Sequence, residues 1–225
     1  MGRKFSMGDA IRFGWNTMKD NIGFFIALLI VAFLIKGLPQ GIGKLFLNDA
    51  PLIAFLFFLT SWIVGFVVNM GLIKISLKFC DGFKGKLDDL LSSFDLLINY
   101  IAGSILYVLI VIAGLIFFII PGIILAIKFF FYSYYIIDKR MGPVEALKAS
   151  SKATMGFKMD LLLFGMLIGL INFAGLLCLF VGLFATIPTS MVAYAYVYRV
   201  LSGPTASPAS SEPSESGNPL YVNLG

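Results

Sequence analysis

Six runs of apolar residues dominate the chain, and each holds enough of them to cross a hydrocarbon core about 30 Å thick. The runs cover residues 21–38, 51–77, 99–120, 122–137, 160–179 and 182–201. Hydrophobic residues make up 59% of the chain and charged residues only 13%, whereas about a quarter of the residues in a soluble protein are charged. The sequence therefore predicts an all-α polytopic membrane protein with six transmembrane helices. The fourth and sixth runs are short, so these helices are either supported by their neighbours or half-buried.

Basic residues gather on one side of these segments. Fourteen of the 17 lie before the first segment, in the loops that follow the second and fourth, or at the end of the sixth. Because Lys and Arg mark the cytoplasmic side, we predict an inner (plasma) membrane protein with both termini in the cytoplasm. No cleavage site follows the first segment, so the N-terminus is expected to be retained. The charges are scattered and mixed with acids, which argues against nucleic acid as a partner.

Residues 1–201, the predicted membrane domain, contain three similar units. Each has a short amphipathic helix on the cytoplasmic side, a membrane segment, an outer turn, and a returning segment that opens at a proline. The three prolines are Pro51, Pro121 and Pro188, and the last two end the motif F-x-x-I-P. Internal repeats are common where a central site forms between the copies. Convergence explains the pattern equally well, because any hairpin protein reuses Pro and Phe.

The three amphipathic helices are predicted at about 8–20, 86–97 and 142–156. Ser6 and Asp9 have the spacing of a capping box at the start of the first. The polar face of the second is acidic, so it suits docking against protein at least as well as binding anionic lipid. The third has a face of small residues and hydroxyls, including Ser150 and Thr154, which favours close packing against the membrane helices.

The region around the third amphipathic helix resembles a known family. Gly142–Pro143, Ala146, Ser150, Thr154 and Gly156 follow Ile120–Pro121–Gly122 by about twenty residues, and a tyrosine-rich segment later closes in Tyr198–Arg199. This pattern is similar to prokaryotic integral-membrane proteins of unknown function, related to the membrane domain of glycerophosphodiester phosphodiesterases. The likeness is best over 114–201, looser over 5–110, and ends before 202. The resemblance implies a multi-helix inner-membrane protein. It does not imply phosphodiesterase activity, because the catalytic barrel is absent.

The side chains that usually carry catalysis are scarce. The chain has no histidine, its two cysteines are far apart, and the membrane segments hold no carboxylate pair. No phosphate loop is present, since DGFKGK at 81–86 lacks the required spacing. We therefore predict that the chain is not an enzyme and that it binds neither a cofactor nor a metal ion.

Lys128 is the one charged residue between positions 115 and 137. A charge near the middle of a membrane costs about 2.5–3.5 kcal/mol on insertion scales. Lys128 therefore either binds an anionic group, such as a lipid phosphate, or extends its long side chain to the outer headgroups. Asn69 and Asn172 are further embedded polar residues, and each serves either a ligand or a hydrogen bond between helices.

Two other features suggest contacts with partners. Gly165 and Gly169 form a GxxxG motif, which allows close packing either inside the chain or between two copies. Residues 202–225 are rich in Ser, Pro, Gly and Glu, so this cytoplasmic tail is expected to be disordered. The tail ends in Pro219–Leu220–Tyr221–Val222, which is either a docking motif or inert.

Two functions remain open on the sequence. The first is a scaffold or accessory protein that acts through membrane lipids, or through proteins bound by its amphipathic helices and tail. The second is a small transporter or channel with a site near Lys128, Asn69 and Asn172. The sequence favours the first, because few embedded polar residues are available to line a wide polar pathway.

Overall fold

A computed structural model describes residues 6–178 and 181–203. These residues form helices and no strand, which confirms the all-α prediction. The helices are α1 (Met7–Asp20), α2 (Ile22–Leu45), α3 (Pro51–Cys80), η1 (Leu87–Leu90), η2 (Phe94–Leu96), α4 (Leu97–Phe117), α5 (Ile119–Phe129), α6 (Tyr132–Lys139), α7 (Pro143–Ala153), α8 (Lys158–Leu177) and α9 (Leu183–Ser202). Most of the predicted tail, from residue 204 on, lies outside the described residues.

Five stretches within the described ranges are long and apolar enough to cross a membrane. They are Ile22–Leu45, Pro51–Cys80, Leu87–Phe117, Ile119–Lys139 and Lys158–Leu177. The chain therefore has the helices of a membrane-integral protein. The predicted sixth span is present as helix α9 but is not among the five, because Thr186, Thr189, Ser190 and several tyrosines lower its hydropathy.

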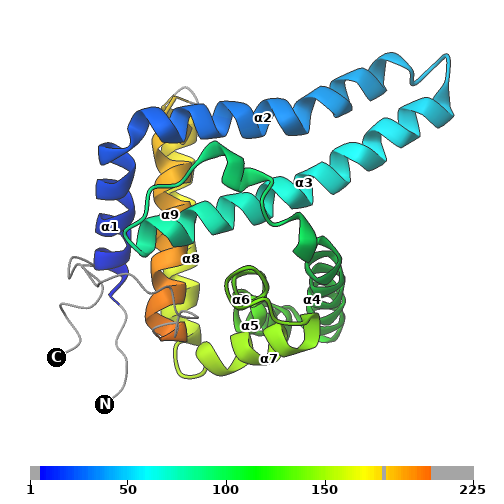
Figure 1. Cartoon of the computed structure of the whole chain (residues 1–225). Coiled ribbons are helices and arrows are strands. Elements are labelled where there is room, and N and C mark those ends of the chain that lie inside the picture. The colour runs from blue at the N-terminus through cyan, green and yellow to red at the C-terminus, as the bar shows by residue number, and fades with distance from the viewer. Residues whose placement is uncertain (1–5, 179–180, 204–225) are drawn as a thin grey trace.

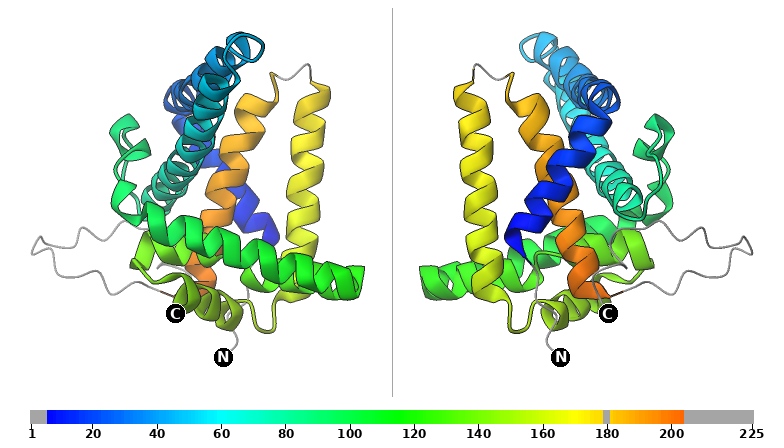
Figure 2. Two further views of the ribbon diagram at one scale, coloured as in Figure 1. Left: turned by 90° about the vertical axis from the view of Figure 1, so that its right-hand side faces the viewer. Right: turned by 90° about the vertical axis from the view of Figure 1, so that its left-hand side faces the viewer.

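The long helices form three hairpins that point away from a common base in different directions (Figures 1 and 2). The hairpins are α2–α3, α4–α5 and α8–α9, and each pair is in close contact. The α4–α5 hairpin runs across the direction of α8–α9 (Figure 2). Helices α3, α6 and α9 meet at the base, where they share a buried core rich in aromatic side chains. The three apolar hairpins, called arms below, therefore diverge from a shared base.

The segment before each hairpin packs on another hairpin in a cyclic order. η1 lies on α3, α7 lies on α6 and on the α4–α5 hairpin, and α1 runs along α9 and so closes the cycle (Figure 1). Two glycines allow the closest of these approaches: a Cβ at Gly14 would collide with the Thr189 carbonyl, and one at Gly71 would collide with the Leu90 backbone. Each of the three hairpins is thus covered at the base by the segment that precedes the next hairpin.

Two of the three predicted amphipathic segments are α-helices, α1 and α7. The Ser6 hydroxyl accepts a hydrogen bond from the Asp9 N–H at 3.3 Å and caps α1. The segment at 86–97 was predicted as one helix, and this is wrong: it forms the two short 3₁₀ turns η1 and η2. The Asp89 carboxylate accepts from Lys78 Nζ at 2.6 Å and from the Lys86 N–H at 2.9 Å. The Lys78 bond holds Asp89 against α3 instead of leaving it in solvent.

The prediction that each returning segment opens at a proline holds only for α3. Pro51 occupies its first turn, where the missing N–H costs little. Helix α5 begins two residues before Pro121, and α9 begins five residues before Pro188. Pro188 therefore lies inside α9, where its ring removes the N–H that would bond to the Phe184 carbonyl.

The predicted fourth segment, 122–137, is not one helix, because α5 ends at Phe129 and α6 begins at Tyr132. Hydroxyls of α7 bind the backbone at this break. Ser150 Oγ accepts from the Phe131 N–H at 3.1 Å and donates to the Lys128 carbonyl at 3.1 Å. Thr154 Oγ1 lies 3.0 Å from the same carbonyl. Ser150 and Thr154 thus bond across a helix contact, and they supply partners that a broken helix would otherwise lack.

Candidate functional site

The three embedded polar residues singled out in the sequence do not come together. Asn69 on α3 accepts a hydrogen bond from Lys36 Nζ on α2 at 2.9 Å. Asn172 on α8 donates to Ser190 Oγ on α9, also at 2.9 Å. Lys128 on α5 has its Nζ 5.2 Å from the centre of the Phe129 ring and no ion pair within the described ranges. Each residue belongs to a different hairpin.

The α8–α9 hairpin has a polar seam inside it. Asn172 Oδ1 and Thr186 Oγ1 are buried and have no hydrogen-bond partner within the described part of the chain. Ser190 Oγ donates to the Thr186 carbonyl at 2.7 Å. The seam binds the two helices to each other, at a desolvation cost for the unsatisfied oxygens.

The GxxxG motif does not mark a close approach of two helix backbones within the described residues. A Cβ at Gly165 would lie 3.7 Å from the Tyr194 hydroxyl, and one at Gly169 would meet no described atom within 4 Å. The close approach in this hairpin is instead between Gly175 and Gly182 near its tip. Internal packing through Gly169 is therefore not present in the structure, and pairing between two copies stays a prediction.

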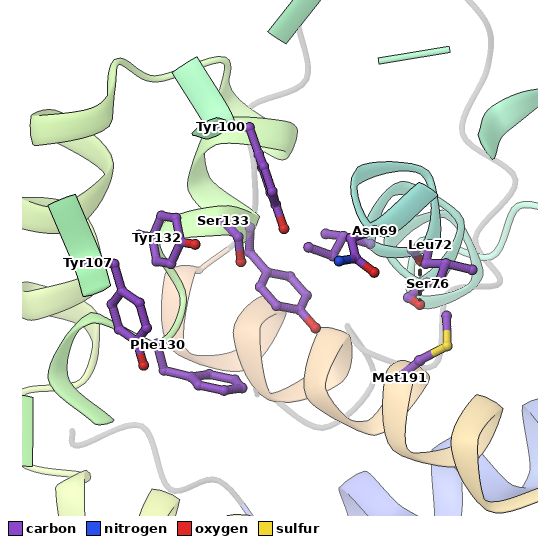
Figure 3. Close-up of a pocket in the computed structure, with 11 residues that line it drawn as sticks. Asn69, Leu72, Ser76, Tyr100, Tyr107, Phe130, Tyr132, Ser133 and Met191 are labelled. Carbon is purple, nitrogen blue, oxygen red and sulfur yellow. Dashed lines mark hydrogen bonds between the residues drawn. The ribbon is translucent and has the colours of Figure 1, made fainter. Parts of the chain in front are cut away.

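A cavity of about 360 Å³ lies between the three hairpins near their base. Figure 3 shows Asn69 of α3, Tyr100 of α4 and Met191 of α9 facing it from different sides. Ser133 and Tyr134 of α6 also line it, together with Leu72, Ile73, Ser76, Tyr107, Phe130 and Tyr132. Asn69 is the one predicted ligand-binding residue that lines this cavity, whereas Lys128 and Asn172 do not.

The polar groups on the cavity wall are all uncharged. Ser76 donates to the Leu72 carbonyl at 2.8 Å, and the hydroxyls of Tyr132 and Ser104 bond to each other at 2.9 Å. The hydroxyls of Tyr100, Ser133 and Tyr134 have no hydrogen-bond partner among the residues that the structure describes. A mostly apolar wall with a few free hydroxyls suits an apolar molecule that carries one or two uncharged polar groups.

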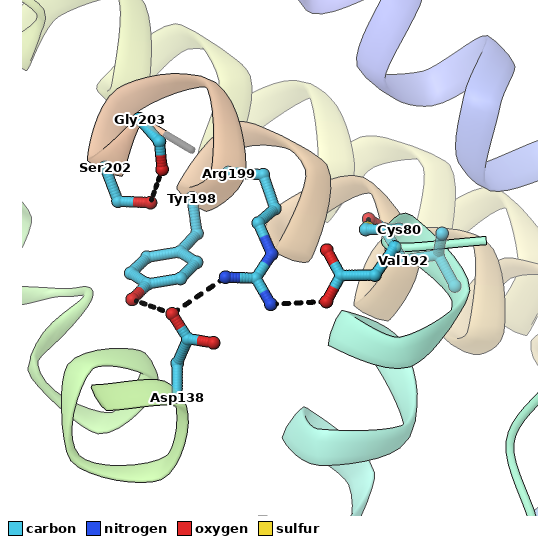
Figure 4. A network of polar contacts seen from close by, with 8 residues as sticks. Cys80, Asp138, Val192, Tyr198, Arg199, Ser202 and Gly203 are labelled. Carbon is cyan, nitrogen blue, oxygen red and sulfur yellow. Dashed lines mark hydrogen bonds and ion pairs between the residues drawn. The ribbon is translucent and has the colours of Figure 1, made fainter. Parts of the chain in front are cut away.

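A buried ion-pair network joins the three hairpins at the base (Figure 4). Arg199 of α9 donates from Nη1 to Oδ2 of Asp138 in α6 at 2.7 Å, and from Nη2 to Oδ2 of Asp81, just after α3, at 2.6 Å. Tyr198 donates its hydroxyl to the same oxygen of Asp138 at 2.8 Å. Burial raises the pKa of Asp81, and the charge of Arg199 offsets only part of that rise. One guanidinium thus holds the C-terminal ends of α3, α6 and α9 together.

Sequence reasoning missed this network. Arg199 was noted as the basic residue at the end of the sixth run and in the Tyr198–Arg199 pair of the family resemblance, and Asp138 was not singled out. The available signal was positional: Asp81, Asp138 and Arg199 each stand at the end of the second segment of a predicted unit. Because equivalent ends of repeated units tend to meet at one centre, opposite charges at these three places indicate a shared contact.

No family model and no solved structure matches the chain. Three curated proteins are similar to it: an uncharacterized protein of Mycobacterium bovis, and uncharacterized proteins of the CDC 1551 and H37Rv strains of Mycobacterium tuberculosis. Each is 25% identical over 228 aligned positions, which cover 88% of this chain and 69% of the relative. The chain is thus similar to mycobacterial proteins whose names state no activity.

Proposed function

We propose that the chain is an inner-membrane scaffold or accessory protein that binds lipids or protein partners and catalyses no reaction. We also propose that both termini face the cytoplasm and that the chain is related to the prokaryotic membrane family that it resembles. The charge asymmetry of the loops supports the orientation. The lack of histidine and of an embedded carboxylate pair supports a role without catalysis.

One observation carries this proposal: the embedded polar residues Lys128, Asn69 and Asn172 do not line a common path. Asn69 and Asn172 are hydrogen-bonded inside their own hairpins, and Lys128 stands apart from both. A transporter for a polar solute needs polar groups along a continuous route, because each unpaired polar group in hydrocarbon costs several kcal/mol. The hydroxyls of the central cavity are not continued by Lys128 or Asn172 into a polar route.

The ligand we propose is a membrane lipid or a similar apolar molecule in the central cavity. Its acyl portion would contact the apolar wall, and its ester or hydroxyl oxygens would bond to Tyr100, Ser133 or Tyr134. A charged headgroup would find no charged side chain on that wall. The sides of the three arms, which are largely apolar and exposed, would contact bulk lipid.

The transporter alternative is tested by flux. Purified protein would be reconstituted in vesicles of its own membrane lipids, and the release of trapped small anions and cations would be followed beside Lys128→Met and protein-free vesicles. We expect the same slow leak from all three. Selective flux in the wild type that Lys128→Met abolishes would overturn the scaffold proposal and establish the site near Lys128.

A further inference from the structure

The tip of the α4–α5 hairpin carries no polar side chain. Five consecutive apolar residues, 116–120, are 71–79% exposed there. The apolar stretch extends from Val108 to Ile127, between Tyr107 and Lys128. The loop between α2 and α3 differs, because it exposes Lys44, Asn48 and Asp49. The α2–α3 loop is thus suited to water, and the α4–α5 tip is suited to hydrocarbon.

The backbone of this tip needs little water. Phe118 alone connects the two helices. Its N–H donates to the Gly114 carbonyl at 3.1 Å, and its own carbonyl accepts from the Gly122 N–H at 3.3 Å. Pro121 has no N–H to satisfy. Irregular backbone exposed to lipid is costly because its polar groups lack partners, and this turn leaves few such groups.

The length of the apolar stretch matches one leaflet. The ten residues 108–117 rise about 15 Å in a helix, which is half of a core about 30 Å thick. Tyr107 donates its hydroxyl to the Ala126 carbonyl at 3.3 Å, so Tyr107 lies level with the turn that holds Lys128. Below this level α4 packs against α6 and α7 of the base. Tyr107 and Lys128 therefore mark the polar end of an apolar arm that reaches no deeper than one leaflet at any tilt.

The direction of the arm is an independent observation. The α4–α5 hairpin runs across α8–α9 (Figure 2), and contacts at the base connect the two hairpins. If α8 crosses the membrane, the α4–α5 hairpin cannot also stand along the membrane normal while the base stays intact. An oblique or in-plane arm remains within the leaflet that it enters.

We propose that the α4–α5 hairpin is re-entrant: residues 108–127 insert among the acyl chains of one leaflet and return without exposing their turn on the far side. With the orientation proposed above, this is the cytoplasmic leaflet. Lys128 then lies at the phosphates of that same leaflet, where a long cationic side chain is stable. A re-entrant hairpin and a crossing hairpin both return to the same side, so loop charges do not distinguish them.

Chemical labelling gives the first test. In a Cys80→Ala/Cys178→Ser background, Phe118→Cys would be compared with Asn48→Cys in the α2–α3 loop. A membrane-impermeant maleimide would be applied to each face of membrane vesicles in turn, and then after detergent. We expect the reagent to label Asn48→Cys from the far face, and Phe118→Cys only in detergent. Labelling of Phe118→Cys from the far face would overturn the proposal.

Fluorescence quenching gives a measure of depth that does not depend on labelling. Phe118→Trp, in a Trp15→Phe/Trp62→Phe background, would be reconstituted with lipids brominated at shallow or deep acyl positions. A tip inside one leaflet stays among the acyl chains, so bromines on the chains should quench it, and iodide in the water on the far face should not. Quenching by iodide from the far face would place the tip at the far headgroups and overturn the proposal. Either outcome leaves the scaffold function standing, because that function does not depend on where this tip ends.

Discussion

Arg199 Nη1 lies 2.7 Å from Asp138 Oδ2, and both side chains are only 9% exposed. This ion pair joins the end of the third hairpin to the end of the second, across 61 positions of sequence. A buried pair of this kind adds little net stability by itself, but removing one partner leaves an uncompensated charge. The pair therefore makes the relative placement of the hairpins sensitive to either residue.

Arg199→Met should destabilise the protein by about 3–5 kcal/mol, because it leaves the Asp138 carboxylate buried without its partner. The matched control is Arg140→Met, which breaks the exposed pair with Asp95, where the side chains are 69% and 50% exposed. That control should cost about 0–1 kcal/mol. Denaturant unfolding in a fixed lipid–detergent mixture measures both. Equal losses would show that the Arg199 network is no more important than a surface pair.

Asp81→Asn should be milder than Asp138→Asn, because burial already raises the pKa of Asp81 and opposes its charge. A carboxyl whose pKa is raised on folding lowers stability above that pKa, and this penalty disappears as protonation occurs. The wild type should therefore gain stability relative to Asp81→Asn as the pH falls from about 7 toward the ordinary Asp pKa of about 4. Thermal unfolding of both proteins across this range checks the sign. A wild type that loses stability relative to Asp81→Asn as the pH falls would contradict this prediction.

Ser150→Ala should cost about 1–3 kcal/mol, since it leaves the Phe131 N–H at the α5–α6 break without its hydroxyl partner. Ser151→Ala on the same helix is the control and should change stability by about 0.5 kcal/mol or less. Hydrogen exchange at the Phe131 amide gives a local readout, and exchange there should speed up only in Ser150→Ala. Unchanged exchange would mean that the break does not depend on α7.

Gly71→Ala should destabilise the base, because the added methyl group would collide with the Leu90 backbone. Gly169→Ala meets no described atom within 4 Å, so the change should be neutral or raise stability by about 0.5–1 kcal/mol through lower backbone entropy. Size-exclusion chromatography with light scattering accompanies the unfolding measurement. Loss of a dimer in Gly169→Ala would show that the GxxxG motif joins two copies.

Local sequence features predicted the helical class and the apolar stretches. The apolar composition predicted a membrane environment. The three-residue spacing of Ser6 and Asp9 predicted the cap at the start of α1. The break between α5 and α6 could not be predicted, because it depends on the hydroxyls of Ser150 and Thr154, 19 to 26 positions from the atoms they bind. The predicted helix at 86–97 is not formed because Asp89 pairs with Lys78 of α3 and bonds to the Lys86 N–H, which a helix pattern does not contain.

The candidate site was less predictable still. Lys128, Asn69 and Asn172 were chosen because polar residues are rare in apolar runs. That a residue is polar does not indicate the direction in which its side chain points. The Arg199–Asp81 contact spans 118 positions, and the cavity wall draws on all three hairpins. The ion pair and the cavity both depend on the angles at which the hairpins leave the base. The hydrophobic pattern of a single helix does not determine those angles.

The central claim is that the cavity between the hairpins holds a lipid or a similar apolar molecule. Native mass spectrometry of the protein released from nanodiscs of its own membrane lipids tests it most directly, with Ser133→Leu to fill the cavity and Lys128→Met as the control. We predict that one defined lipid or apolar molecule stays bound to the wild type and to Lys128→Met, and is lost from Ser133→Leu. Loss from Lys128→Met alone, or no specific retention by the wild type, would contradict the claim.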